Sequence, residues 1–243
     1  MRSLMLMTAL LAVASAATAA PKGTKNVQTG FLFQSLKDKP QYTYVVYVPR
    51  NYDAKQDWPL ILFLHGMGES GKDGQKQIAQ GIGQAILWEA QRWPAIVLMP
   101  QKPTYESAWE DHEPAVMEML KLVRKEYNID SKRIYLTGLS QGGHGTWVLG
   151  SRHTDLFAAL APICGYGDPK EIAPKLAKMP IWTFHGDADG AVPVAQTQNM
   201  VAAVKDAGGD PKMTIYPGVD HNSWDKAYRE SGLWEWLFKQ KKD

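Results

Sequence analysis

Residues 133–143, Arg-Ile-Tyr-Leu-Thr-Gly-Leu-Ser-Gln-Gly-Gly, decide the fold class. The run 133–137 is rich in β-branched and aromatic residues, which is typical of a strand that is covered on both faces. Glycines at 138, 142 and 143 permit a sharp turn around Ser140, and a helical pattern follows at 142–152. Strand, glycine turn and helix form the context in which G-x-S-x-G builds a nucleophile elbow, a strained turn that exposes its serine at the end of the strand.

The chain on either side of this segment repeats the alternation of strand and helix. Short apolar runs predict further strands at 31–36, 42–48, 59–64, 95–99, 157–161, 181–184 and 212–216. Helical patterns occupy 75–90, 114–127, 142–152, 194–207 and 224–238. This alternation predicts an α/β fold with a mostly parallel central sheet and helices on both faces. In such sheets the chemistry lies at the carboxyl ends of the strands, so the loops that follow the strands are the ones to search.

The composition excludes several classes of protein. The chain has 27 Lys and Arg against 25 Asp and Glu, a net charge of +2, which leaves no broad basic surface for nucleic acid. At 44% hydrophobic and 21% charged residues, it is globular rather than disordered. Its one cysteine excludes an internal disulfide and a cysteine-based zinc site. We therefore expect no metal, no cofactor and no nucleic-acid partner.

The N-terminal residues 1–19 have the pattern of a cleaved signal peptide. Arg2 precedes an apolar run at 4–13, and Ala-Thr-Ala at 17–19 fits a cleavage site for small residues. The run is too short to span a bilayer, which needs about 20 apolar residues. We expect a secreted or periplasmic protein without stable membrane anchoring, in which residues 20–243 form a single catalytic domain.

Two later loops offer a base and an acid for Ser140. A serine hydroxyl becomes an effective nucleophile only when a neighbouring base takes its proton. His221, in the segment Gly-Val-Asp-His-Asn-Ser-Trp after the last predicted strand, is the best-placed of six histidines. The acid should lie between the serine and the histidine in the sequence, directly after another strand. Asp187 and Asp189 both satisfy this, and we favour Asp189 because it lies further into the loop.

Two further loops complete the predicted site. An oxyanion that forms at the reacting carbonyl needs backbone N–H donors, one of them from the residue after the nucleophile, Gln141. The other is expected from Met67, in the glycine-flanked loop His-Gly-Met-Gly at 65–68. Trp109 follows the fourth strand and is a candidate for stacking on substrate, although a tryptophan that covers the helix beneath it would have the same sequence pattern.

Together, residues 64–70, 138–143, 185–193 and 221–224 resemble the α/β-hydrolase superfamily over nearly the whole chain after residue 19. Within it, the chain is similar to the exported phospholipase/carboxylesterase and prolyl-oligopeptidase-like "predicted peptidase" groups and to the feruloyl and acetylxylan esterases of carbohydrate esterase family one. The loop Pro-Gln-Lys-Pro at 100–103 departs from the Pro-Gln-Cys that is common in the family. A β-propeller of true prolyl oligopeptidases is absent, which argues against peptidase activity.

The resemblance implies a serine carboxylic ester hydrolase that acts through an acyl-enzyme with Ser140, His221 and Asp189. Its expected substrates are small-molecule or polysaccharide esters, with short acyl, acetyl or feruloyl groups. Residues 164–180 hold too little chain for a lid, so we expect no large cap domain. A peptidase or thioesterase is the alternative, because acyl-transfer machinery does not itself specify the leaving group. A non-catalytic binding protein on the same scaffold is a remote alternative, because no residue of the triad is missing.

Overall fold

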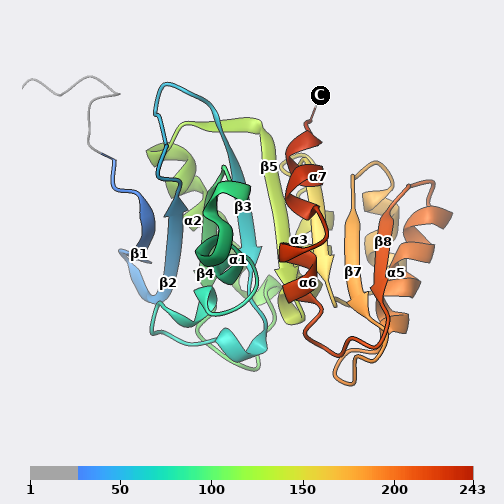
Figure 1. The fold of residues 1–243 in the computed structure, drawn as a ribbon. Helices are drawn as coiled ribbons and strands as arrows, with labels where there is room; N and C mark the ends of the chain where they lie inside the picture. Colours follow the sequence, from blue (N-terminus) through green and yellow to red (C-terminus); the bar gives the residue numbers. More distant parts are fainter. Residues whose placement is uncertain (1–26, 243) are drawn as a thin grey trace, which may run out of the picture.

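The computed structural model describes residues 27–242, and the expected signal peptide at 1–19 lies outside these residues. Eight strands form one sheet in the order β1-β2-β4-β3-β5-β6-β7-β8 (Figure 1). They are β1 (Gly30–Leu36), β2 (Lys39–Val48), β3 (Trp58–Leu64), β4 (Ile96–Gln101), β5 (Ile129–Leu139), β6 (Ala159–Ile163), β7 (Trp182–Gly186) and β8 (Lys212–Tyr216). Each of the predicted strands overlaps one of these, although β6 begins at Ala159 rather than at 157.

The sheet is mostly parallel, as the sequence predicts. β1 and β2 form an antiparallel edge, and β2 also pairs antiparallel with β4. From β4 to β8 all neighbours are parallel. The buried strand β3 lies at the centre, where Leu62 pairs with Leu98 on one side and with Leu136 on the other. The carboxyl ends of the parallel strands therefore lie together along one end of the sheet, the lower end in Figure 1.

Helices cover both faces of the sheet because alternate residues of its central strands point to opposite sides. Leu60, Leu62 and Leu64 belong to the buried cluster that includes residues of α2, α3 and α5. Ile61 and Phe63 belong to the cluster on the other face, with residues of α1, α6 and α7, which lie in front of the sheet in Figure 1. The helices are α1 (Ile82–Glu89), α2 (Glu113–Glu126), α3 (Gln141–Arg152), α4 (Pro169–Ile172), α5 (Val194–Asp206), α6 (Trp224–Arg229) and α7 (Leu233–Lys239).

Two predicted helices are interrupted by glycines. The predicted helix at 75–90 is a 3₁₀ turn at Lys76–Ile78 followed by α1, because Gly81 between them has a φ of 63°. A side chain there would also meet Leu139 and Phe63. The predicted helix at 224–238 is divided into α6 and α7 by Gly232, which has a φ of 73°. Both glycines have a positive φ, which the interior of a right-handed helix excludes.

The connection between β6 and β7 is short, as expected. It holds only α4 and a 3₁₀ turn at Ala173–Leu176, so this connection contains no cap domain. Over residues 27–242, no helix combines the length and the apolar character that crossing a bilayer requires.

Candidate active site

Ser140 stands at the junction of β5 and α3, where the chain reverses abruptly. Its φ of 55° and ψ of −117° lie in a region that side chains rarely adopt. The Ser140 N–H donates to the Ile163 carbonyl oxygen at 2.9 Å, and the Ser140 carbonyl accepts from the His144 N–H at 3.0 Å. A β-carbon on Gly138 would overlap the Gly142 carbonyl, so this turn needs a glycine two residues before Ser140. These constraints hold the serine in a strained conformation in the cleft described below.

Ser140, His221 and Asp189 form one hydrogen-bonded chain. The Nε2 atom of His221 lies 2.9 Å from Ser140 Oγ, and its Nδ1 atom lies 2.7 Å from Asp189 Oδ2. A carboxylate can only accept, so Nδ1 carries the proton and Nε2 is free to accept from the serine hydroxyl. This is the tautomer that a histidine needs to act as a base toward Ser140.

The structure separates the two candidate acids. Asp189 is buried, and its Oδ1 accepts from the N–H groups of Ala191 and Val192 at 2.8 Å each. Burial raises the pKa of Asp189, but the hydrogen bonds from His221 and from these two amides outweigh it, so the pKa lies below its usual value. Asp187 is exposed and accepts from the Gly218 N–H at 2.7 Å. Asp189 is therefore the acid in contact with His221. Asp187 instead links its loop, through the hydrogen bond to Gly218, to the loop that carries His221.

Two other histidines are fully buried in the loops around the site, and one of them also contacts Asp189. His65 is fully buried, and its Nε2 accepts from the Lys102 N–H at 3.2 Å. Burial lowers the pKa of His65 to about 3, so the ring is neutral. His185 is also fully buried, and its Nε2 lies 2.9 Å from the Val192 carbonyl oxygen and 3.1 Å from Asp189 Oδ2.

A cleft of about 550 Å³ opens over Ser140 and His221. It is lined by Gly66, Met67, Gly68, Glu69, Tyr105, Leu139, Ser140, Gln141, Tyr166, Ala191, Val192, Pro193, Gln196, His221 and Trp224. Both expected oxyanion donors are among these residues. Met67 begins a 3₁₀ turn and Gln141 begins α3, and the N–H at the start of a helix has no partner within that helix. The two N–H groups are thus candidates for a shared oxyanion site next to Ser140.

Trp109 does not contribute to this cleft, which corrects its predicted role in substrate stacking. Its side chain is fully buried, and its Nε1 donates to the His65 carbonyl oxygen at 3.0 Å. The indole packs edge-on against the His65 ring and contacts the position where a side chain on Gly145 would lie. Trp109 therefore braces the loop that carries Met67 against α3, which is the alternative that its sequence pattern left open.

Two aromatic walls of the cleft, Tyr105 and Tyr166, carry no sequence motif that predicts them. Tyr105, which is 54% exposed, comes from the loop after β4, and Tyr166 comes from the loop after β6. The Tyr166 ring stacks on His144 at a centroid distance of 4.6 Å. His144 Nε2 lies 3.0 Å from Glu110 Oε1, and its Nδ1 lies 3.0 Å from the Tyr166 carbonyl oxygen. Both partners are acceptors, so His144 makes both bonds only when it is protonated.

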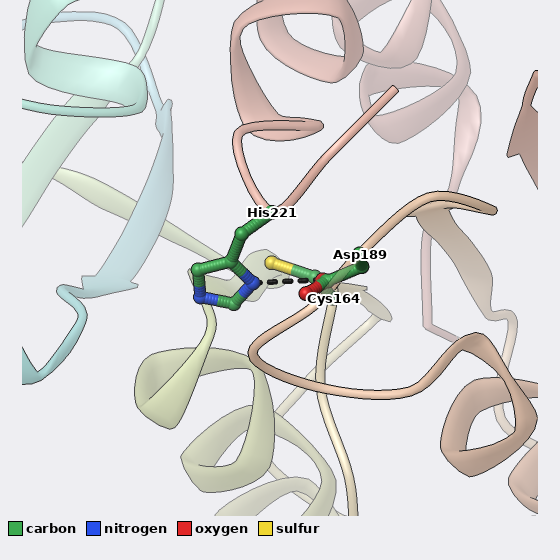
Figure 2. Close-up of side chains that lie close together, drawn as sticks. All are labelled: Cys164, Asp189 and His221. Atoms are coloured by element: carbon green, nitrogen blue, oxygen red, sulfur yellow. Dashed lines mark hydrogen bonds and ion pairs between the residues drawn. The ribbon is translucent and has the colours of Figure 1, made fainter. Parts of the chain in front are cut away.

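Cys164 lies beside Asp189 and His221, as Figure 2 shows. One ligand atom from each of the three residues falls within 4.8 Å of the others, a spacing that a metal ion could bridge. Burial raises the pKa of the Cys164 thiol to about 12, and metals bind the thiolate. The carboxylate and the imidazole are already bonded to each other. These residues therefore fit a hydrogen-bonded Asp-His pair with a protonated thiol next to it, not a metal site.

The fold is that of an α/β-hydrolase, with a serine at the strained turn between β5 and α3. The family model of the dienelactone hydrolase family matches residues 83–231, which is more than half of the chain. The chain therefore belongs to the dienelactone hydrolase family.

Individual relatives agree with this family. The chain is 31% identical over 189 residues to a bifunctional acetylxylan esterase/xylanase of Neocallimastix patriciarum, covering 72% of this chain and 26% of that protein. It spans less than half the length of several curated relatives that it matches. Among solved structures, it is similar to a thermostable esterase with a TM-score of 0.75 and 34% identity, covering 87% of this chain and 63% of that one. A ferulic acid esterase of Anaeromyces mucronatus shares the fold, with a TM-score of 0.68 and 14% identity over 92% of this chain and 96% of the other.

Proposed function

We propose that the protein is an exported serine carboxylesterase that forms an acyl-enzyme on Ser140. The observation that carries the proposal is the chain of hydrogen bonds from Asp189 through His221 to Ser140 Oγ, at 2.7 and 2.9 Å, at the floor of an open cleft. The family and the similarity to esterases favour the same activity. The pattern of a signal peptide at 1–19 supports export to the periplasm or the medium.

In the first half-reaction, His221 Nε2 takes the proton of Ser140 Oγ as the oxygen attacks the ester carbonyl. The carboxylate of Asp189 stabilises the imidazolium that forms and holds its Nδ1–H in place. The N–H groups of Met67 and Gln141 are proposed to stabilise the oxyanion. The C–O bond to the alcohol then breaks, His221 returns the proton to the departing alkoxide, and an ester of Ser140 remains.

In the second half-reaction, water takes the place of the alcohol. His221 removes a proton from the water as it attacks the acyl-Ser140 carbonyl, and Ser140 Oγ leaves with that proton. The open cleft and the absence of a cap between β6 and β7 favour small acyl groups and tolerate a bulky alcohol. Short-chain esters and acetyl or feruloyl esters of polysaccharide are therefore the proposed substrates.

A fluorophosphonate probe tests the proposal, because it reacts only with an activated serine. We expect stoichiometric labelling of the wild-type chain on Ser140, with loss of 4-nitrophenyl acetate hydrolysis in proportion. Ser140→Ala should remain unlabelled, whereas Ser35→Ala, which removes an exposed hydroxyl on β1, should label normally. An unlabelled wild-type chain, or faster cleavage of the matching 4-nitroanilide than of the ester, would contradict a carboxylesterase.

A further inference from the structure

The lining of the cleft contains an acidic side chain but no lysine or arginine. Among the residues that line it, Glu69 is the one carboxylate, and none is a lysine or an arginine. Its remaining walls are the aromatic rings of Tyr105, Tyr166 and Trp224 with short apolar and amide side chains. Any ester that reaches Ser140 therefore meets one ionisable acid and no fixed cation.

Glu69 lies on the same loop as the proposed oxyanion donor Met67. Its Oε2 atom is 3.1 Å from the position that a β-carbon on Gly66 would occupy, and the same β-carbon would lie 3.6 Å from the Ser140 β-carbon. The carboxylate thus stands close to the reacting centre. Glu69 is half-buried, so solvent screens its charge less than that of a surface acid.

Nothing in the described chain neutralises this carboxylate. Glu69 takes part in none of the ion pairs found within residues 27–242. Lys102, the buried cation of the loop after β4, directs its Nζ to the carbonyl oxygens of Thr104 and Tyr105 instead. Burial raises the pKa of Glu69, and hydrogen bonds from the N–H groups of Glu69 and Gly66 oppose the rise. Glu69 is thus an acidic side chain that faces the cleft without a cationic partner among residues 27–242.

We propose that Glu69 selects substrates by charge, so that the cleft favours neutral or cationic esters and rejects esters that carry a free carboxylate near the scissile bond. The inference rests on the proposed function and adds a residue that determines specificity. Two carboxylates within a few ångströms repel each other strongly where water is partly excluded. The hydroxyl groups of a neutral alcohol can instead donate to Glu69.

A matched pair of acyl groups isolates this effect. The 4-nitrophenyl ester of monomethyl glutarate is neutral, and the 4-nitrophenyl ester of glutarate has nearly the same shape with a free carboxylate. Both develop the same oxyanion, so the ratio of their kcat/KM values reports the charge of the substrate alone. At pH 7.5 and low salt, we expect the wild-type enzyme to favour the neutral ester by at least about tenfold, which corresponds to about 1.4 kcal/mol.

Glu69→Gln keeps an acceptor for the loop amides and removes the charge. We expect it to reduce the preference by about fivefold or more, because kcat/KM for the anionic ester rises relative to that for the neutral ester. Asp206→Asn, the same change of charge on an exposed residue at the end of α5, should leave the ratio unchanged. For the wild-type enzyme, raising the ionic strength from 10 to 500 mM should also reduce the preference.

A wild-type enzyme without a preference for the neutral ester would overturn the inference. So would a preference that Glu69→Gln leaves within twofold, or one that does not fall with salt. The salt series keeps the test decisive even where Glu69→Gln is too unstable to assay. A wild-type enzyme that hydrolyses neither ester contradicts the proposed function instead, and the inference falls with it.

Discussion

The carbonyl oxygen of Leu64, at the end of β3, occupies the space that a β-carbon on Gly142 would need. The first turn of α3 can therefore approach β3 only because residue 142 has no side chain. This close approach brings the two loops of the proposed oxyanion site together, because Gln141 directly precedes Gly142 and Met67 follows Leu64 by three residues.

We expect Gly142→Ala to be strongly destabilising, because a rigid backbone carbonyl has to move to make room. The cost should be about 3 kcal/mol or more, which lowers Tm by roughly 6–12 °C in a domain of this size. Thermal unfolding followed by circular dichroism measures it. Gly190→Ala is the control, since a side chain there meets no atom within 4 Å. Equal melting temperatures for the two variants would show that the Leu64 carbonyl can move aside at little cost in stability.

The two aspartates of the loop after β7 should differ widely in their effect on turnover. In Asp189→Asn the side-chain oxygen can keep the loop amides while an NH₂ donor faces His221, which disfavours the tautomer that the base needs, so kcat should fall by about 10⁴-fold near neutral pH. Asp187→Asn weakens only the contact with the Gly218 N–H and should change kcat by less than about tenfold. Steady-state kinetics on 4-nitrophenyl acetate compares them. The reverse order would move the acid to Asp187.

The ion pair between His144 and Glu110 should make stability depend on pH. Burial and the charge of Arg152 lower the pKa of His144, but Glu110 and the Tyr166 carbonyl outweigh them and raise it above its usual value. A raised pKa stabilises the fold below the unfolded value of 6.5, and this contribution is lost as the pH rises through the folded pKa. Both partners are largely buried, with exposed fractions of 15% and 25%, so the pair contributes about 1–2 kcal/mol.

Glu110→Gln should therefore lower the free energy of unfolding more at pH 6 than at pH 9. Chemical denaturation at the two pH values measures the difference. Glu106→Gln, which removes an exposed carboxylate from the neighbouring loop, is the matched control and should show no such dependence. An equal loss at both pH values would mean that His144 is neutral throughout.

The length of the acyl chain should limit turnover. The connection between β6 and β7 holds no cap that could form a deep tunnel for a fatty chain, in which each buried CH₂ would add about 0.8 kcal/mol of binding. We expect kcat/KM to peak at about C2 to C4 in a series of 4-nitrophenyl esters, without a jump in rate at the solubility limit. A maximum at C12, or activation at an interface, would contradict the open cleft.

The central strands β3 and β4 could be predicted from the sequence because both of their faces are buried, which makes each of them a continuous apolar run. The helix boundaries could not be predicted from the sequence. Gly81 and Gly232 divide helices in the structure, but a glycine is tolerated within a helical pattern at a modest cost. Nothing local shows whether the chain continues through it or turns.

Some residues of the candidate site could likewise be predicted from the sequence, and others could not. The juxtaposition of Ser140, Asp189 and His221 could be predicted because each lies in a segment that follows the end of a strand, where the fold brings distant loops together. Trp109 could not be placed, because its loop can direct the indole toward the cleft or toward α3, and the sequence does not distinguish these paths. The cleft wall at Tyr166 depends on its stacking against His144 from another loop, a contact without a motif.

The measurement that tests the central claim most directly is kcat/KM for purified Ser140→Ala beside the wild-type enzyme on 4-nitrophenyl acetate, with matching circular dichroism spectra. Because Ser140 and His221 act as one unit, we predict a loss of about a million-fold for Ser140→Ala, a similar loss for His221→Ala and little further loss for the double variant. Retention of more than a few per cent of wild-type activity by Ser140→Ala would contradict a serine nucleophile at residue 140.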